Sequence, residues 1–195
     1  IVERFDIGNV HKGGAVFDRE RLEWLNGQWI RRLSADDLID RLRPFVEAEL
    51  AAGRIDWLPS DDELRALLPV AQERLPTLGA IGDLVGFLWV KDLEIDPSAL
   101  VPKRWDLATT RDGLAAARDT IESVGEVVFE ADELEPPLRA LAETRGWKVG
   151  DLFMAIRVAV TGRTATPPLF DTLVALGRDR VVTRLEHALA VIADA

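Results

Sequence analysis

The stretch LFMAIRVAVTGRTATPPLF, residues 152–170, is the clearest guide to the fold class. Its first part, Leu152 to Val160, predicts a helix, and Thr161-Gly162 is a typical helix end. A polar loop follows, and Pro167-Pro168 opens a second, short helix. The stretch therefore predicts two helices joined by a loop, with Arg157 and Arg163 close to the start of the second helix.

Helical spacing of apolar residues extends from this stretch in both directions. Leu134, Leu138 and Leu141 share one face of a helix that Gly146 ends. Earlier helices begin with residues that cap helix N-termini, and the predicted caps are Asp18, Ser34, Ser60 and either Thr109 or Thr110. The only candidate strand, residues 127–129, is too short to build a sheet. We therefore predict an all-α protein of nine or ten helices.

Two further predictions in the first half depend on apolar patterning alone. The spacing of Leu22, Leu25 and Trp29 predicts one apolar helix face, with the two tryptophans of that helix in the core. Residues 80–89 are apolar with small residues, and they are predicted to form a buried helix. Residues 91–109 contain prolines and little periodicity, so we expect a loop with at most one short helical turn.

The composition excludes several classes of protein. Apolar residues make up 48% and charged residues 30%, which is ordinary for a soluble globular chain and unlike collagen or disordered proteins. Cysteine is absent, so disulfides, thiolate metal sites and cysteine nucleophiles are impossible. Two histidines are too few for a histidine-rich metal site. No run of about 18 apolar residues occurs, so we expect no membrane contact and a cytoplasmic location.

The net charge of −10 argues against a protein that coats DNA, but the charge is unevenly spread. Residues 1–135 contain 16 Lys and Arg against 28 Asp and Glu. Residues 136–195 contain eight Lys and Arg against six Asp and Glu. A local basic surface can therefore form near the C-terminus of an acidic protein.

Signatures of catalysis are missing from the sequence. It has no G-x-S-x-G nucleophile motif, no H-E-x-x-H zinc motif and no G-x-x-x-x-G-K phosphate loop. Gly79, Gly82 and Gly86 have the wrong spacing for a dinucleotide loop and instead predict close helix contacts. The acidic pairs at residues 36–37 and 61–62 fall at predicted helix starts, where carboxylates stabilise the helix dipole.

Two stretches contain polar residues that helix packing does not explain. In residues 17–31 these are Asn26 and the Arg31-Arg32 pair. In residues 157–170 a new helix N-terminus presents free amides beside two arginines, and such a surface suits phosphates or base edges. The alternative is that these arginines are only solvated, as charged loop residues usually are.

The residues of these two stretches resemble a known family. The first follows the pattern F-D-x-x-(K/R)-L-x-W-x-N-x-x-(Y/W)-I-R, and the second follows R-x-A-x-T-G-R-x-x-x-P-x-L-F. The two patterns in this order resemble bacterial glutamyl-tRNA synthetases, and Glu186-His187-Ala188-Leu189 resembles the end of those enzymes. The resemblance covers essentially the whole chain, and it implies the α-helix cage that binds the anticodon, of the type that discriminates glutamate tRNA from glutamine tRNA.

The resemblance also implies how the chain is divided. Residues 1–33 correspond to the end of a stem-contact region with a connecting helix, residues 34–125 to a first helical anticodon-binding subdomain, and residues 126–195 to a second. The family's catalytic domain, which activates glutamate with ATP and Mg²⁺, precedes the first pattern. We therefore expect a monomeric C-terminal fragment that binds glutamate tRNA, needs no cofactor of its own and catalyses nothing alone. The alternative is a stand-alone helical interaction protein that has lost tRNA binding.

Candidate site residues follow from the resemblance position by position. The positions that surround an anticodon base in that family are matched here by Arg157, Thr166, Pro167 and Leu169, and Arg163 lies in the same loop. Arg74, which precedes residues 75–78, matches an arginine that contacts the third anticodon base in discriminating members. The alternative for Arg74 is a cation at a helix end, where it suits the helix dipole.

Overall fold

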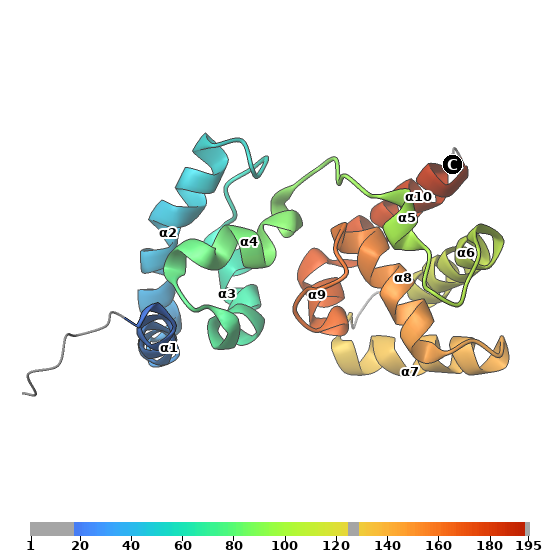
Figure 1. Ribbon diagram of the computed structural model, residues 1–195, viewed down its shortest axis with the longest axis horizontal. Helices are drawn as coiled ribbons and strands as arrows, with labels where there is room; N and C mark the ends of the chain where they lie inside the picture. The colour runs from blue at the N-terminus through green and yellow to red at the C-terminus, as the bar shows by residue number, and fades with distance from the viewer. Residues whose placement is uncertain (1–17, 125–128, 194–195) are drawn as a thin grey trace, which may run out of the picture.

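The computed structural model describes residues 18–124 and 129–193, and every regular element in these ranges is a helix (Figure 1). The α-helices are α1 (Arg19–Ile30), α2 (Ala35–Ala51), α3 (Asp61–Ala71), α4 (Ile81–Val85), α5 (Pro97–Leu100), α6 (Leu107–Ser123), α7 (Ala131–Thr144), α8 (Val149–Thr161), α9 (Leu169–Leu176) and α10 (Arg178–Ala193). Short 3-10 helices are η3 (Gln72–Arg74), η4 (Leu78–Ala80) and η5 (Gly86–Trp89). The predicted all-α class is confirmed, and most of the candidate strand lies outside the described residues. Within those ranges, none of the helices combines the length and apolar character that a membrane crossing requires.

Side-chain caps start the first three helices as the sequence predicts. The Asp18 carboxylate accepts a hydrogen bond at 2.9 Å from the amide three residues later, and the Ser34 hydroxyl accepts one at 3.2 Å in the same way. Ser60 and Glu63 form a reciprocal capping box. These contacts satisfy amides that the first turn of a helix leaves unpaired, so each helix begins where local chemistry places it.

Helix α6 begins earlier than predicted. Its N-cap is Asp106, whose carboxylate accepts a hydrogen bond from the Thr109 amide at 2.7 Å. The Asp106 carbonyl accepts another from the Thr110 hydroxyl at 2.8 Å. The predicted caps Thr109 and Thr110 therefore lie inside the helix, because an ionised carboxylate is a stronger acceptor for the free amides than a hydroxyl. The one short turn expected in the preceding loop is α5.

The predicted helix over residues 80–89 is buried but interrupted. Helix α4 ends at Val85, which adopts φ −135° and ψ 2°, and η5 continues the segment. The carbonyls of Phe87 and Val90 accept hydrogen bonds from the Arg184 side chain on α10. The helix is thus interrupted where its carbonyls bond Arg184, more than 90 residues away in the chain. A local pattern of apolar residues does not reveal such a distant partner.

Glycine allows α4 to approach α2 closely. A Cβ atom built at Gly82 would collide with the Glu49 side chain of α2. At Gly79 and Gly86 a Cβ atom would lie in ordinary contact, 3.6 Å from the side chains of Phe45 and Ile55. The interpretation of these glycines as packing residues is therefore confirmed most clearly at Gly82.

Helix α1 differs most from its prediction. Trp24 and Trp29 are 60% and 66% exposed, and Leu22 and Leu25 are exposed as well. The buried positions of this helix are Gly27 and Ile30. The prediction of two tryptophans in the core was wrong, because α1 packs against η3 through its other side and no described element covers the tryptophans.

In space the helices form two groups (Figure 1). Helices α1 to α4 lie on one side of the molecule, and α5 to α10 lie on the other. Helix α6 packs on α7, α8 and α10, so it belongs to the second group. The predicted subdomain boundary between residues 125 and 126 remains a prediction. In the structure, the chain passes from the first group of helices to the second earlier, between η5 and α5.

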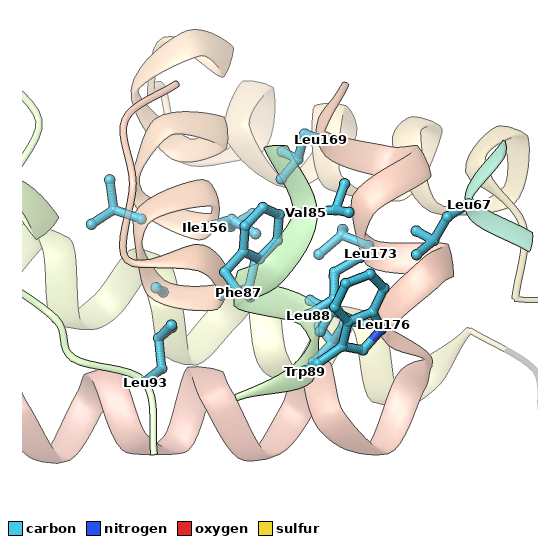
Figure 2. Packing of buried hydrophobic residues seen from close by; sticks show 14 of the residues in the cluster. Leu67, Val85, Phe87, Leu88, Trp89, Leu93, Ile156, Leu169, Leu173 and Leu176 are labelled. Atoms are coloured by element: carbon cyan, nitrogen blue, oxygen red, sulfur yellow. The ribbon is translucent and has the colours of Figure 1, made fainter. Parts of the chain in front are cut away.

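The segment around η5 forms a large part of the apolar contact between the two groups, next to the packing of α3 on α9 (Figure 2). The side chains of Phe87, Leu88 and Trp89 are buried in a single hydrophobic cluster. They lie among side chains of α8 and α9, namely Ile156, Leu169, Leu173 and Leu176. One continuous core therefore extends through both groups and reaches both ends of the α8–α9 loop, at Val160 and Leu169.

A buried arginine joins the same parts of the chain. Arg184 is only 5% exposed, and its guanidinium donates to the carbonyls of Val160, Phe87 and Val90 at 2.6, 2.8 and 2.8 Å. Burial lowers the pKa of Arg184 to about 10, with a further contribution from nearby Arg180. The guanidinium is therefore still charged at neutral pH, and its hydrogen bonds are charge-assisted.

Replacement of this arginine tests its structural role. Arg184→Met is expected to lower the free energy of unfolding by at least about 3 kcal/mol, because each buried acceptor left without a donor costs about 1–3 kcal/mol. The measurement is urea unfolding at neutral pH. The control is Arg178→Met, because Nε and Nη2 of Arg178 are buried without a hydrogen-bond partner. Equal losses in the two variants would contradict the assignment.

Candidate nucleic-acid interface

The loop that connects α8 to α9 contains most of the predicted site residues. Gly162 ends α8 in the left-handed conformation, with φ 69°. The Thr161 hydroxyl donates to the Arg157 carbonyl at 2.6 Å and accepts from the Arg163 amide at 3.2 Å. The last turn of α8 and the first residue of the loop are therefore held by one hydroxyl group.

Three of the predicted residues shape the second half of this loop. Pro167 and Leu169 are buried, and Leu169 enters the core shown in Figure 2. The Thr166 hydroxyl donates to the Pro167 carbonyl at 2.9 Å. Pro167 and Leu169 thus fix the path of the backbone, while the partly buried Thr166 retains an oxygen that can accept a hydrogen bond.

Arg157 carries a polar atom with no hydrogen-bond partner among the described residues. The side chain is half-buried on α8, and its Nε atom is buried without a hydrogen bond. Buried donors are almost always paired in folded proteins, so such an atom requires an explanation. Nε itself is closed to solvent, so a contact of Arg157 with a ligand must use the terminal nitrogens of its guanidinium.

Arg163, in contrast, has partners within the protein. Its guanidinium donates to the Asp83 carbonyl of α4 and lies over the Phe87 ring, 5.4 Å from the ring centroid. This arginine therefore ties the α8–α9 loop to the first group of helices. The role of Arg163 in tRNA binding stays a prediction.

Two aromatic rings and an arginine beside the loop were missed by sequence reasoning. Phe153 of α8 and Phe170 of α9 contact edge to face, with centroids 5.0 Å apart. Arg139 of α7 lies over the Phe153 ring, 5.4 Å from its centroid. RNA bases stack on aromatic rings and on guanidinium planes, so this triplet extends the candidate interface. Its members come from three helices, and no spacing in the sequence relates them.

A cavity of about 640 Å³ adjoins the loop on another side. Thr164 of the loop and Met154 of α8 line it, together with Lys103 and Arg104 from the segment before α6. Arg104 is 3.4 Å from the Asp151 carboxylate, and Lys103 is exposed. The cavity therefore adds an apolar wall and positive charge to the same region.

Arg74 lies apart from this loop, at the end of η3. Residues 72–76, which include it, are called the Arg74 corner below. The exposed guanidinium of Arg74 donates to the Val70 carbonyl at 2.8 Å. This bond agrees with the alternative of a cation at a helix end. The structure therefore brings Arg157, Arg163 and residues 166–169 together, while Arg74 belongs to a different part of the surface.

Helix α1 provides the partners for the Arg74 corner. The Asn26 side chain donates to the Pro76 carbonyl at 2.8 Å, and the Arg31 guanidinium donates to the Glu73 carbonyl at 3.2 Å. These bonds explain two of the polar residues that helix packing left unexplained. The third, Arg32, lies over the Trp29 ring, 5.4 Å from its centroid.

A second cavity, of about 530 Å³, lies between the two groups of helices and is mainly acidic. Its lining includes the carboxylates of Glu49, Asp56, Asp83, Asp92 and Glu94. A hydrogen bond from Arg54 lowers the pKa of Glu49, which favours its charged form. Phosphates are repelled from such a surface. Among the described residues there is also no group of three or more metal-ligating side chains that could hold a metal ion.

Comparison with known proteins agrees with this geometry. Residues 37–189 match the protein family described as the anticodon binding domain. The chain belongs to this family. The anticodon-binding domain is 44% identical over 198 residues to a glutamate–tRNA ligase of Roseiflexus castenholzii (strain DSM 13941 / HLO8) and 43% identical over 195 residues to one of Roseiflexus sp. (strain RS-1). These alignments cover 100% and 98% of this chain, and the chain spans 38% of each relative's length.

A solved structure shows the same fold. The crystal structure of a glutamate tRNA ligase from Elizabethkingia meningosepticum CCUG26117, in complex with its amino acid, superposes with a TM-score of 0.77 at 23% identity. The match covers 96% of the anticodon-binding domain and 35% of that chain. The sequence matches confirm the resemblance to glutamyl-tRNA synthetases, and this solved structure shows that the helical arrangement is shared.

Two glycines with the same backbone conformation allow a matched test of the α8–α9 loop. Gly146 and Gly162 have φ of 68° and 69°, but only at Gly162 would a Cβ atom meet another backbone atom, the Glu94 carbonyl oxygen at 2.7 Å. Gly146→Ala is expected to cost about 1–2 kcal/mol, the price of the left-handed region for an L-residue. Gly162→Ala is expected to cost about 1–3 kcal/mol more, because the backbone of residue 94 must shift. Urea unfolding measures both, and equal costs would refute the close contact.

Proposed function

We propose that this domain reads the anticodon of glutamate tRNA within a cytoplasmic glutamate–tRNA ligase. The chain spans 38% of relatives with that name, and the remainder of such an enzyme would activate glutamate with ATP and Mg²⁺. The observation that carries the proposal is the match of residues 37–189 to the anticodon binding domain family, because this range includes Arg157 and the α8–α9 loop. The catalytic step is assigned to the absent remainder of the enzyme.

The chemistry of an anticodon loop suits this surface. Its unstacked bases expose Watson–Crick edges, which arginines and short hydroxyl side chains can read, and ring faces, which aromatic side chains can stack on. Arg157 and Thr166 provide the first kind of group, and Phe153 and Phe170 the second. The region also lies in the part of the chain with a positive charge balance, so phosphates are attracted locally despite the net charge of −10.

The exposed face of α1 favours a contact with further protein. Leu22, Leu25 and Trp29, spaced three and four residues apart on the helix, form an exposed apolar surface. We assign this surface to the remainder of the ligase. The same exposed surface would also suit the alternative function, a helical interaction protein that does not bind tRNA. A measurement of tRNA binding distinguishes the two functions.

The deciding experiment is a titration of the chain with glutamate tRNA at several salt concentrations. A tRNA-binding domain should show an affinity that falls steeply with salt, with a slope of about −0.7 to −0.9 per phosphate contact. A tRNA with altered anticodon bases should bind more weakly. Absence of binding at low salt would favour the interaction protein.

The contribution of Arg157 can be measured in the same titration. Arg157→Ala is expected to weaken binding by about 1–3 kcal/mol, as for other arginines that read base edges. Arg118→Ala is the control, because Arg118 lies on α6 and is paired with Asp119 at 2.6 Å. Equal effects of the two substitutions would show that the site is misplaced.

Arg74 is proposed to select the third anticodon base. Glutamate anticodons end in cytosine, whose Watson–Crick edge offers the acceptors O2 and N3. Glutamine anticodons end in guanine, which offers there the two donors N1–H and N2–H₂ and one acceptor. Arginine only donates, so it satisfies cytosine and leaves donors facing donors on guanine. Unpaired polar groups are a strong source of discrimination.

Competition between the two tRNAs tests this role. The wild-type chain is expected to prefer glutamate tRNA by about 1–3 kcal/mol. Arg74→Gln should narrow this gap mainly by improving binding of the glutamine tRNA, because glutamine can both donate and accept. An unchanged ratio would assign Arg74 to the end of its helix, where it bonds Val70.

A further inference from the structure

Helix α1 and the Arg74 corner are joined by hydrogen bonds, some donated by side chains of α1 and some donated by a side chain of the corner. Asn26 and Arg31 of α1 donate to the carbonyls of Pro76 and Glu73, which lie on either side of Arg74. In return, the Gln72 side chain donates to the carbonyls of Ile30 and Leu33 at the end of α1, both at 3.0 Å. The backbone that carries Arg74 is therefore held on both sides by one helix.

The packing between these bonds is close. A Cβ atom at Gly27 would lie 3.4 Å from the Leu75 carbonyl oxygen, so α1 passes directly beside η3. Arg31 and Arg74 line the same hollow of about 170 Å³, together with Trp24 and Pro76. A shift of α1 along its axis would break the bonds of Asn26 and Arg31 and would move the Arg74 corner with it.

We propose that Asn26 and Arg31 are positioning residues for Arg74, and that α1 thereby sets how the third anticodon base is read. The proposal rests on the proposed function, in which Arg74 contacts that base. The outer face of α1 carries the exposed Leu25 and Trp29, so a contact on that face is linked through Asn26 and Arg31 to base selection. Neither residue contacts the base; each acts on the backbone that carries Arg74.

The test compares variants that remove one donor each. Asn26→Asp keeps the shape of the side chain but removes its N–H donor, and Arg31→Ala removes the second bond. Each is expected to reduce the preference for cytosine over guanine at the third anticodon base roughly 2- to 10-fold, the size of one lost hydrogen bond. Arg31→Lys, which can still donate to the Glu73 carbonyl, should restore part of the preference. Preference at the first anticodon base should stay unchanged.

Two controls separate positioning from loss of stability. Arg32→Ala removes the neighbouring arginine, which contacts Trp29 and makes no hydrogen bond to η3, so it should leave selection intact. Hydrogen exchange of the RNA-free protein reports on the corner itself. The Leu75 amide, bonded to the Ala71 carbonyl at 3.1 Å, should exchange faster in Asn26→Asp and Arg31→Ala than in the wild type.

Each outcome is decisive. Faster exchange at Leu75 together with a lower third-base preference supports the proposal. Unchanged exchange at Leu75, or faster exchange with an unchanged preference, overturns it. If the wild type treats cytosine and guanine alike and Arg74→Gln has no effect, the assignment of Arg74 itself fails, and the proposal falls with it for that distinct reason.

Discussion

The burial of one charged guanidinium is the constraint on which this fold depends. Transfer of a charge out of water is costly unless every donor finds an acceptor. Arg184 directs three of its five N–H donors to carbonyls from two distant places, Val160 at the end of α8 and Phe87 and Val90 around η5. The two groups of helices must therefore keep one relative arrangement, and the segment after α4 must leave regular helical bonding to provide the acceptors.

The position of the candidate interface follows from this constraint. Val160 lies just before the Thr161-Gly162 helix end, so the bond that joins the two groups also fixes where the α8–α9 loop begins. Arg163 adds a second tie from that loop to α4. A loop held in this way can present Arg157 and Thr166 with little loss of conformational entropy on binding. The acidic cavity between the groups is lined partly by Thr161, Gly162 and Arg163, so phosphates are expected to approach the loop from its other side, where Thr164 adjoins Lys103 and Arg104.

Helix α1 shows how one short helix can serve two contacts. One side bonds η3 through Asn26 and Arg31, and the opposite side exposes Leu25 and Trp29. An amphipathic pattern in the sequence does not reveal whether an apolar helix face packs in the core of its own domain or contacts another part of a larger protein. The periodicity is the same in both cases. This ambiguity is the reason that the tryptophans were placed in the core.

The sequence by itself determined the helical class, the starts of α1, α2 and α3, and the glycine ends of α8 and α9. These features depend on contacts within three or four residues, such as the capping box of Ser60 and Glu63, and such contacts are visible in a linear pattern. It also pointed to Arg157 and the 166–169 segment as a candidate site, through the resemblance of motifs. The tertiary structure alone decided the break after Val85, the exposure of Trp24 and Trp29, the stack of Arg139 on Phe153 and the separation of Arg74 from Arg157. These features depend on partners that are distant in the chain, as with Arg184 and Phe87, and no local period records which distant backbone group a side chain will meet.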